Sequence, residues 1–353
     1  MGLARQRDCL AAAGLTPGVI GTIQGARAPS TRTLYDAKWK VFLKWCSAQS
    51  PSLAPAQAPI GEVLRFLQSR LDEGLTSSTI KVYLAAISAC HAGYGDKPVA
   101  EHPWVPPFMK GVRRATATDK PLFPLWDLAV VLDGLCKPPF EPLESADVRV
   151  LSLKTILLVA LTTTKRVSDI QALSVASDCM RFSDDGKTVW LKPNLKFVTK
   201  TLRVPELPVK LVAFHPPPFL TDEDKRLHCL CPVRALRLYV QKTCGSRSTS
   251  QLFVSYKAGE KHGAVGRASL SRWIVEAIKA AYMSTGTRPP EALRAHSTRG
   301  VATSWALARG ASVREICESA NWASPSTFVA FYHLDVSTSS VAHAVLGVAD
   351  TAQ

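Results

Sequence analysis

A histidine and an arginine lie three residues apart in the segment His296–Arg299, a spacing that places both side chains on one turn of a helix. Tyr332 follows further along the chain, with Trp322 between the two segments. A His-x-x-Arg match arises readily by chance, and the simplest alternative is a histidine at a helix end beside a surface arginine. The motif therefore indicates chemistry only in combination with other residues.

A second arginine, Arg166, stands where the apolar run ending at Leu161 gives way to polar residues, with Ser168 and Asp169 able to orient it. Two guanidinium groups bind the nonbridging oxygens of a phosphodiester and stabilise the charge of a pentavalent transition state. A tyrosine hydroxyl needs such a cationic setting to become a nucleophile. Together, the arginines, the histidine and the tyrosine predict phosphodiester transfer without a metal ion.

Apolar residues at helical spacing predict the elements of the first third of the chain. Three amphipathic helices are expected over residues 31–46, 60–71 and 77–87, followed by a shorter element that ends in basic residues. Residues 1–30 show no sustained periodicity and are expected to form a lead-in segment.

The pattern changes in the second half, where a helix over Val148–Leu161 precedes short alternating segments. Met180–Ser183, Thr188–Leu191 and Leu202–Val204 predict a three-stranded antiparallel sheet, and helices resume at Pro232. The expected fold class is therefore mainly α with a small antiparallel sheet, an α+β arrangement.

A polar segment with two prolines, Ala115–Pro124, is the best candidate for a linker between two domains. Residues 1–118 carry 14 basic and 7 acidic side chains, and the remainder carries 29 and 21. Because both halves are basic within a net charge of +15, we expect two domains that bind one polyanion, most simply a nucleic acid. Two basic surfaces that contact only solvent are the alternative.

Other classes of protein lack support in the sequence. No apolar stretch approaches the roughly 20 residues of a membrane-spanning helix, and the N-terminus has no secretory pattern. Nine scattered cysteines indicate reduced thiols, hence an intracellular protein that is not secreted. The cluster of His228, Cys229, Cys231 and Cys244 lacks the paired spacing of a zinc site, and no Gly-rich phosphate loop is present. We expect neither a metal ion nor a cofactor.

With these residues in view, the chain from about residue 31 to 340 resembles the tyrosine recombinase (phage integrase) family. The family's first-arginine box is similar to Thr163–Ile170, its His-x-x-Arg box to His296–Thr303 and its nucleophile box to Ala320–His333. Three family positions differ: Thr164 stands for a glycine, Gly300 for a histidine, and Ala320-Asn321 for Leu-Gly.

The resemblance implies a role for each residue of the set. Arg166, His296 and Arg299 would bind the scissile phosphate, and the indole N–H of Trp322 would donate to it. Tyr332 would attack the phosphorus, giving a 3′-phosphotyrosine and a free 5′-hydroxyl.

The resemblance also implies a lysine as general acid, for which Lys192, Lys196 and Lys200 compete. Lys200 is favoured because Thr199–Leu202 leads directly into the expected third strand and resembles the Thr-Lys-Thr-Leu of Cre-like members. Lys196 is the second choice, and any one of the three could be a solvated turn lysine.

After the lead-in (1–30), the family architecture implies a helical core-binding domain of the SAM-like type (31–118), an integrase-like catalytic domain (119–340) and a C-terminal tail (341–353). Within the tail, the segment around Val341–Gly347 is a candidate for packing on a neighbouring protomer. Its partner would be double-stranded DNA, held as a clamp, with four protomers in the synapse and no membrane, small-molecule substrate, metal or ATP. The candidate phosphate contacts outside the catalytic set are Lys38, Lys40, Lys44, Lys110, Arg113 and Arg114.

Pro29–Tyr35, Leu230–Leu236 and the tryptophan at position 322 resemble recombinases of DIRS-type retroelements, which implies integration of a mobile element and a nuclear location. Two other functions stay open: a noncatalytic DNA-binding protein derived from such an element, and a type IB topoisomerase with the same catalytic set.

Overall fold

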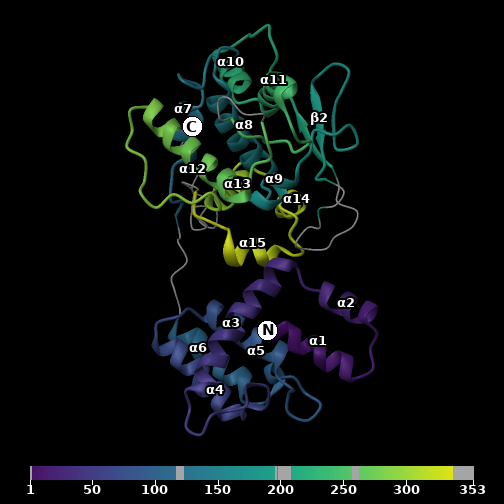
Figure 1. Cartoon of the computed structure of the whole chain (residues 1–353). Coiled ribbons are helices and arrows are strands. Elements are labelled where there is room, and N and C mark those ends of the chain that lie inside the picture. The colour runs from purple at the N-terminus through teal and green to yellow at the C-terminus, as the bar shows by residue number, and fades with distance from the viewer. Residues whose placement is uncertain (1, 117–122, 195–196, 198–207, 257–261, 337–353) are drawn as a thin grey trace. The chain divides into compact units, whose positions relative to one another are not determined.

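The computed structural model describes residues 2–116, 123–194, 197, 208–256 and 262–336. The chain divides into two compact units, Met1–Asp119 and Lys120–Gln353 (Figure 1). The predicted boundary at residues 118 and 119 and the predicted tail 341–353 lie outside the described residues.

The first unit is helical in its described part, and its core is an aromatic cluster between α3, α4 and α5. Phe42 and Phe66 pack edge to face with ring centroids 4.9 Å apart, and Phe66 meets Tyr83 at 5.5 Å. Trp39, Phe42 and Cys46 lie on the buried face of α3, as the apolar spacing predicts. The helices are α1 (Gly2–Ala12), α2 (Pro17–Gly25), α3 (Pro29–Ser47), α4 (Ile60–Asp72), α5 (Ser77–Cys90) and α6 (Val105–Ala115).

Two of these helices, α1 and α2, occupy the segment that the sequence predicts as a lead-in. Helix α1 packs on α3 and α5. Helix α2 starts at a capped turn, in which the Thr16 side chain accepts from Val19 N and Pro17 occupies the first position. Short helices of weak apolar periodicity depend on tertiary contacts, which explains why periodicity did not predict them.

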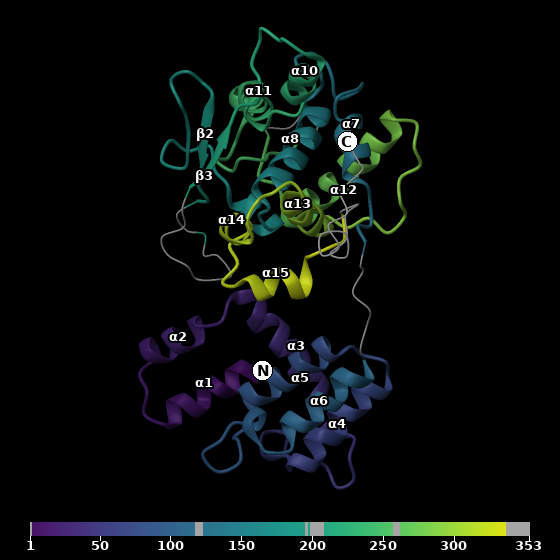
Figure 2. The same ribbon diagram turned by 180° about the vertical axis from the view of Figure 1, so that it is seen from behind.

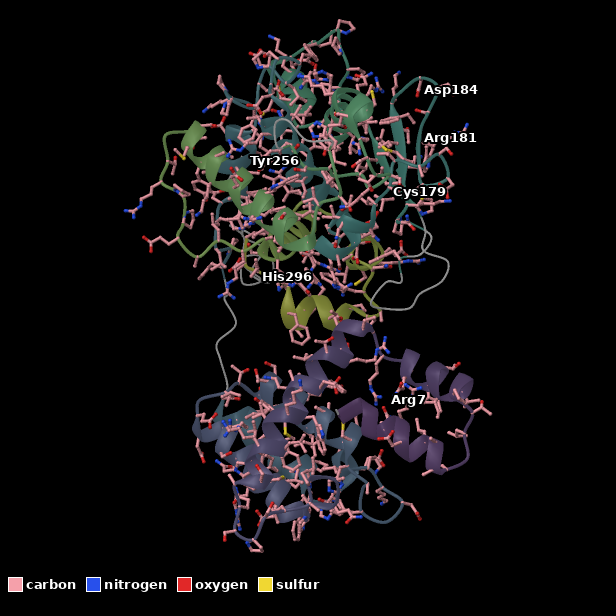
Figure 3. All side chains as sticks on the ribbon, viewed as in Figure 1. Arg7, Cys179, Arg181, Asp184, Tyr256 and His296 are labelled. Carbon is pink, nitrogen blue, oxygen red and sulfur yellow. The ribbon has the colours of Figure 1, made fainter. Side chains whose placement is uncertain are left out.

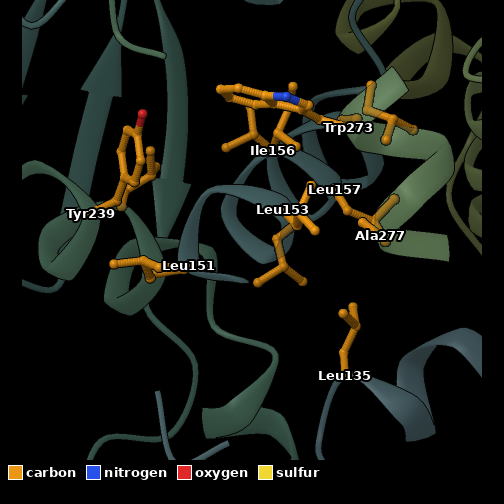
Figure 4. Packing of buried hydrophobic residues seen from close by; sticks show 14 of the residues in the cluster. Leu135, Leu151, Leu153, Ile156, Leu157, Tyr239, Trp273 and Ala277 are labelled. Carbon is orange, nitrogen blue, oxygen red and sulfur yellow. The ribbon is translucent and has the colours of Figure 1, made fainter. Parts of the chain in front are cut away.

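The second unit is built around α8 (Val148–Thr163), which is buried on nearly all sides. Helices α11 and α12 pack against it, and Ile156 and Leu157 of α8 meet Trp273 and Ala277 of α12 (Figure 4). A helix apolar all round belongs in the centre of a core. Its other helices are α7 (Leu128–Gly134), α9 (Val167–Ala172), α10 (Asp222–Cys229), α11 (Pro232–Thr243), α12 (Arg267–Ser284), α13 (Ser297–Ala308), α14 (Val313–Ser319) and α15 (Pro325–Phe331).

A three-stranded antiparallel sheet in the order β1-β2-β3 lies beside these helices (Figure 2). Its strands are β1 (Met180–Phe182), β2 (Thr188–Leu191) and β3 (Val209–Val212). Val189 and Leu211 pair in register and are buried, whereas Arg181 of β1 lies on the outer side (Figure 3). The first two strands agree with the prediction. The predicted strand Leu202–Val204 lies outside the described residues, and the strand that pairs with β2 is Val209–Val212.

One cysteine of the cluster noted in the sequence, Cys231, has a structural role. Cys231 Sγ accepts from the backbone N–H of Arg234 at 3.4 Å and of Phe214 at 3.3 Å, so it caps α11. Within the described part of the chain, no three His, Cys, Asp or Glu side chains are grouped to hold a metal ion. None of the described helices combines the length and apolarity needed to cross a membrane.

Candidate active site

Helices α13 and α15 bring His296 and Tyr332 into contact. His296 is the N-cap residue of α13 and is exposed, and Tyr332 is the C-cap residue of α15. His296 Nε2 lies 3.0 Å from the Tyr332 hydroxyl oxygen, with the rings edge to face at 5.5 Å (Figure 3 labels His296). This distance is within reach for proton transfer between the phenol and the imidazole.

Arg299 lies one turn into α13 and is enclosed by aromatic rings, with only 1% of its surface exposed. Its Cζ is 4.7 Å from the Trp322 ring centroid and 5.4 Å from that of Tyr332, and its Nη2 donates to Ala320 O. Trp322 in turn packs against Tyr332 at 4.6 Å. The nucleophile candidate, the tryptophan and one arginine therefore form a single packed cluster.

Three donors in this cluster are buried and have no hydrogen-bond partner among the described residues: Arg299 Nε, Arg299 Nη1 and Trp322 Nε1. Leaving a buried N–H unsatisfied costs about 1–3 kcal/mol, so native structures pair such groups with an acceptor or a ligand. An oxyanion that presents several acceptor oxygens would satisfy all three.

Burial, followed by the positive charge of Arg166, lowers the pKa of Arg299 to about 10. The charges of Tyr332 and Asp169 act in the opposite direction. Arg299 thus stays charged at neutral pH although its surroundings penalise the charge. A bound anion would offset that penalty, which makes this a site prepared for negative charge.

Arg166 begins α9, directly after the turn that ends α8. Its backbone N–H donates to Asp169 Oδ2 at 3.2 Å, and Ser168 Oγ donates to Asp169 Oδ1 at 3.3 Å. The sequence predicts Ser168 and Asp169 as orienting residues, and the contact that the structure gives is from Asp169 to the Arg166 backbone. The carboxylate fixes the start of the helix and with it the base of the arginine side chain.

Two residues hold the nucleophile segment without being predicted from the sequence. Ser304 is 1% exposed, donates to Tyr332 O at 3.2 Å and accepts from Leu334 N at 2.9 Å. At Gly300 an added Cβ would lie 3.3 Å from Tyr332 O, tighter than ordinary packing. The absence of a side chain at Gly300 thus permits the close approach of Tyr332. A serine in an Ala-Thr-Ser run gives no sequence signal of such a role.

Both family glycines that are replaced in this chain stand at left-handed backbone positions. Thr164 has φ 49° and Asn321 has φ 56°. Asparagine tolerates this region, whereas a β-branched threonine there is an outlier. At both positions the backbone therefore has a conformation that glycine adopts readily.

The structure describes one of the three lysine candidates, Lys192. Lys196 and Lys200 lie outside the described residues. Lys192 directly follows β2, is exposed, and donates its backbone N–H to Cys179 O at 2.7 Å. Because the strand paired with β2 begins at Val209, the expectation that Lys200 leads directly into the third strand finds no support.

The other predicted contacts lie on two helices of the first unit. On α3, Lys40 and Lys44 are exposed, and Lys38 Nζ lies 4.4 Å from the Tyr83 ring centroid. The three exposed basic residues of α6 are Lys110, Arg113 and Arg114.

Comparison with solved structures places this arrangement among known folds. The chain has an integrase-like fold. It is similar to the Tn1549 transposon integrase in complex with transposon right end DNA, at TM-score 0.56 and 11% identity, over 92% of this chain and 95% of that chain. A lambda integrase dimer bound to a core site matches at TM-score 0.51 and 13% identity, over 96% and 78%. The XerH site-specific recombinase bound to a palindromic substrate matches at 0.51 and 13%, over 85% and 74%.

No protein-family model and no curated protein sequence matches the chain. The structural neighbours are tyrosine recombinases and integrases, and the predicted fold class, mainly helical with a small antiparallel sheet, is confirmed.

Proposed function

We propose that this chain is a site-specific DNA recombinase that cleaves and rejoins DNA through a 3′-phosphotyrosyl intermediate. The observation that carries the proposal is the Tyr332 hydroxyl, 3.0 Å from His296 Nε2 and stacked beside the buried Arg299. No other described tyrosine combines these neighbours.

The scissile phosphate binds where Arg299 and Trp322 have unpaired N–H donors, with Arg166 contributing a second guanidinium. Tyr332 Oη attacks the phosphorus as its proton passes to His296. The bond from phosphorus to the 5′ oxygen breaks, and the arginines stabilise the charge that develops on the nonbridging oxygens. Rejoining is the reverse reaction, with a 5′-hydroxyl as the nucleophile and Tyr332 as the leaving group.

Both units are proposed to bind the same duplex DNA, the first through the exposed lysines and arginines of α3 and α6. The basic balance of both halves supports this, as do structural neighbours solved with DNA. Assembly of four protomers on DNA, a role in moving a DIRS-type element, and a nuclear location rest on the sequence resemblance.

The deciding experiment uses a nicked duplex from the termini of the element that carries the gene. After cleavage the short 5′-hydroxyl strand diffuses away and traps the enzyme on the DNA. We expect a covalent adduct on a denaturing gel from the wild type and none from Tyr332→Phe. A native-gel shift without any adduct would instead support the noncatalytic DNA-binding protein, and relaxation of supercoils that is indifferent to a second site would support a topoisomerase.

The general acid is identified with a substrate in which sulfur replaces the bridging 5′ oxygen. A thiolate leaves without a proton, so removing the acid slows cleavage of the oxygen substrate by about 10²–10⁴-fold but not of the sulfur substrate. Alanine variants of Lys192, Lys196 and Lys200 are compared. The general acid is the lysine whose alanine variant is slow on the oxygen substrate and normal on the sulfur substrate. A lysine whose variant is slow on both substrates has another role.

A further inference from the structure

One short segment, Ser319–Trp322, contacts both the turn that precedes Arg166 and the side chain of Arg299. Ser319 Oγ donates to Thr163 O at 3.2 Å and lies 3.0 Å from Thr164 Oγ1. Because the Ser319 proton is used on the carbonyl, the Thr164 hydroxyl is the donor of the second bond. The next residue, Ala320, accepts from Arg299 Nη2 through its carbonyl. Two adjacent residues, Ser319 and Ala320, therefore connect the turn that precedes Arg166 to the side chain of Arg299.

The backbone at Thr164 shows that this link is maintained against a cost. Thr164 ends α8 with φ 49° and ψ 19°, a left-handed conformation that β-branched residues rarely adopt. It is only 7% exposed, and Thr163 is 2% exposed. A residue persists in such a conformation when its surroundings determine it, and the hydroxyl contact with Ser319 is the specific interaction available to the side chain.

We propose that Thr164 and Ser319 are positioning residues, whose paired hydroxyls set the separation of Arg166 and Arg299 and so shape the oxyanion site. The inference rests on the proposed function, in which that anion is the scissile phosphate. Neither hydroxyl touches the phosphate. The two hydroxyls act through the guanidiniums of Arg166 and Arg299. How well these bind the nonbridging oxygens together depends on the distance between them.

Glycine at position 164 separates this role from a purely structural one, because it removes the hydroxyl and relieves the backbone at once. We expect Thr164→Gly to stay folded, to bind the DNA within about 2-fold of wild type, and to form the Tyr332 adduct about 10-fold more slowly. Thr164→Ser, which keeps the hydroxyl, should stay within about 2-fold of the wild-type rate. Ser319→Ala also removes the bond to Thr163 O, so it should be at least as slow as Thr164→Gly. The double variant should be little slower than Ser319→Ala alone, since the bond between the two hydroxyls is already absent.

A second measurement needs no DNA substrate. Binding of inorganic phosphate is followed by ³¹P NMR line broadening in the wild type, Arg166→Gln, Thr164→Gly and Thr164→Ser. We expect broadening in the wild type, its loss in Arg166→Gln, several-fold weaker binding in Thr164→Gly, and recovery in Thr164→Ser.

The adduct assay and the phosphate-binding measurement distinguish failure of the proposed function from failure of the positioning role. A wild type that binds phosphate through these residues but forms no adduct would refute the proposed function and leave the hydroxyl link supported. A Thr164→Gly protein that cleaves and binds phosphate as the wild type does would overturn the positioning role. So would a wild type that does not bind phosphate.

Discussion

The two arginines of the site are held in different ways. Arg299 is buried, with its side chain bonded to a backbone carbonyl and enclosed by two aromatic rings. Arg166 is half-buried, and the contact that fixes it is the bond from its backbone to Asp169. The first guanidinium is preorganised at the expense of burying a charge, whereas the second depends on the turn that carries it. Preorganisation and stability therefore oppose each other at Arg299 and not at Arg166.

Replacing each arginine by methionine tests this difference most directly. Both Arg299→Met and Arg166→Met should slow adduct formation by about 10³-fold, because each removes charge stabilisation in the transition state. Their stabilities should differ, since only Arg299→Met removes a buried charge that is incompletely paired.

Calorimetry of the free proteins checks the second part. We expect Arg299→Met to unfold at or above the wild-type temperature and Arg166→Met to stay within about 2 °C of it. A large drop for Arg299→Met would mean that its carbonyl and ring contacts outweigh the burial of charge.

The pKa of Arg299 predicts a pH effect confined to the buried arginine. Its folded pKa of about 10 lies below the ordinary 12.5. As pH rises through about 10, the folded protein loses this proton while the unfolded chain keeps it, so the group's contribution to stability increases and phosphate binding weakens. Phosphate titrations by ³¹P NMR between pH 8 and 11 measure the weakening. Urea unfolding over the same pH range measures the increase in stability, and Arg299→Met, which lacks the group, corrects for other residues that titrate there. An equal increase in that variant would contradict the assignment.

Replacing the buried Ser304 should have a smaller effect than replacing either arginine. Ser304→Ala removes two bonds to the backbone around Tyr332 and should lower the unfolding free energy by about 1–2 kcal/mol. Adduct formation should slow by about 10-fold as the nucleophile loses its fixed position. Ser284→Ala, which loses one bond to Ala280 O on α12, is the matched control and should cleave at the wild-type rate. Equal rates for the two variants would remove Ser304 from the positioning set.

The smallest effect is expected at the second left-handed residue. Asn321→Gly should change the unfolding free energy by less than about 1 kcal/mol, because asparagine already tolerates this conformation. Its cleavage rate should equal that of the wild type, in contrast to Thr164→Gly. Urea unfolding and the adduct assay measure the two quantities, and a slow Asn321→Gly protein would show that flexibility at a left-handed position, rather than a lost hydroxyl, controls the rate.

The parts of the fold with strong periodicity were predictable. The stripe beginning at Ile60 gives α4, and alternation gives β1 and β2. The start of α5 was predicted from a cap at Ser77 or Ser78, whereas the residue that caps it is Thr76. Helices α1 and α2 were not predicted, because α1 depends on packing against α3 and α5, and α2 packs on α1, contacts that periodicity does not report. The position of β3 was not predicted either, since a short alternating segment specifies no partner.

The residues of the candidate site likewise fall into those that the sequence predicts and those that it does not. His296, Arg299 and Tyr332 could be chosen from residue type and spacing, and the structure brings them together with Trp322. The roles of Ser304 and Gly300 could not, because both act on the backbone of a segment distant in sequence. The same limit applies to Ser319, whose partner lies 155 residues away.

The buried residues of α14 and α15 form a cluster of their own, Ile316, Cys317, Ala320, Trp322 and Phe328, separate from the large core around α8. So small a core contributes little cooperative stability, and segments of this kind open locally at a lower free energy than the global unfolding of the domain. Amide protons around Tyr332 should consequently exchange with solvent well before those of α8. We therefore expect the segment that carries Tyr332 to open locally while α8 stays folded.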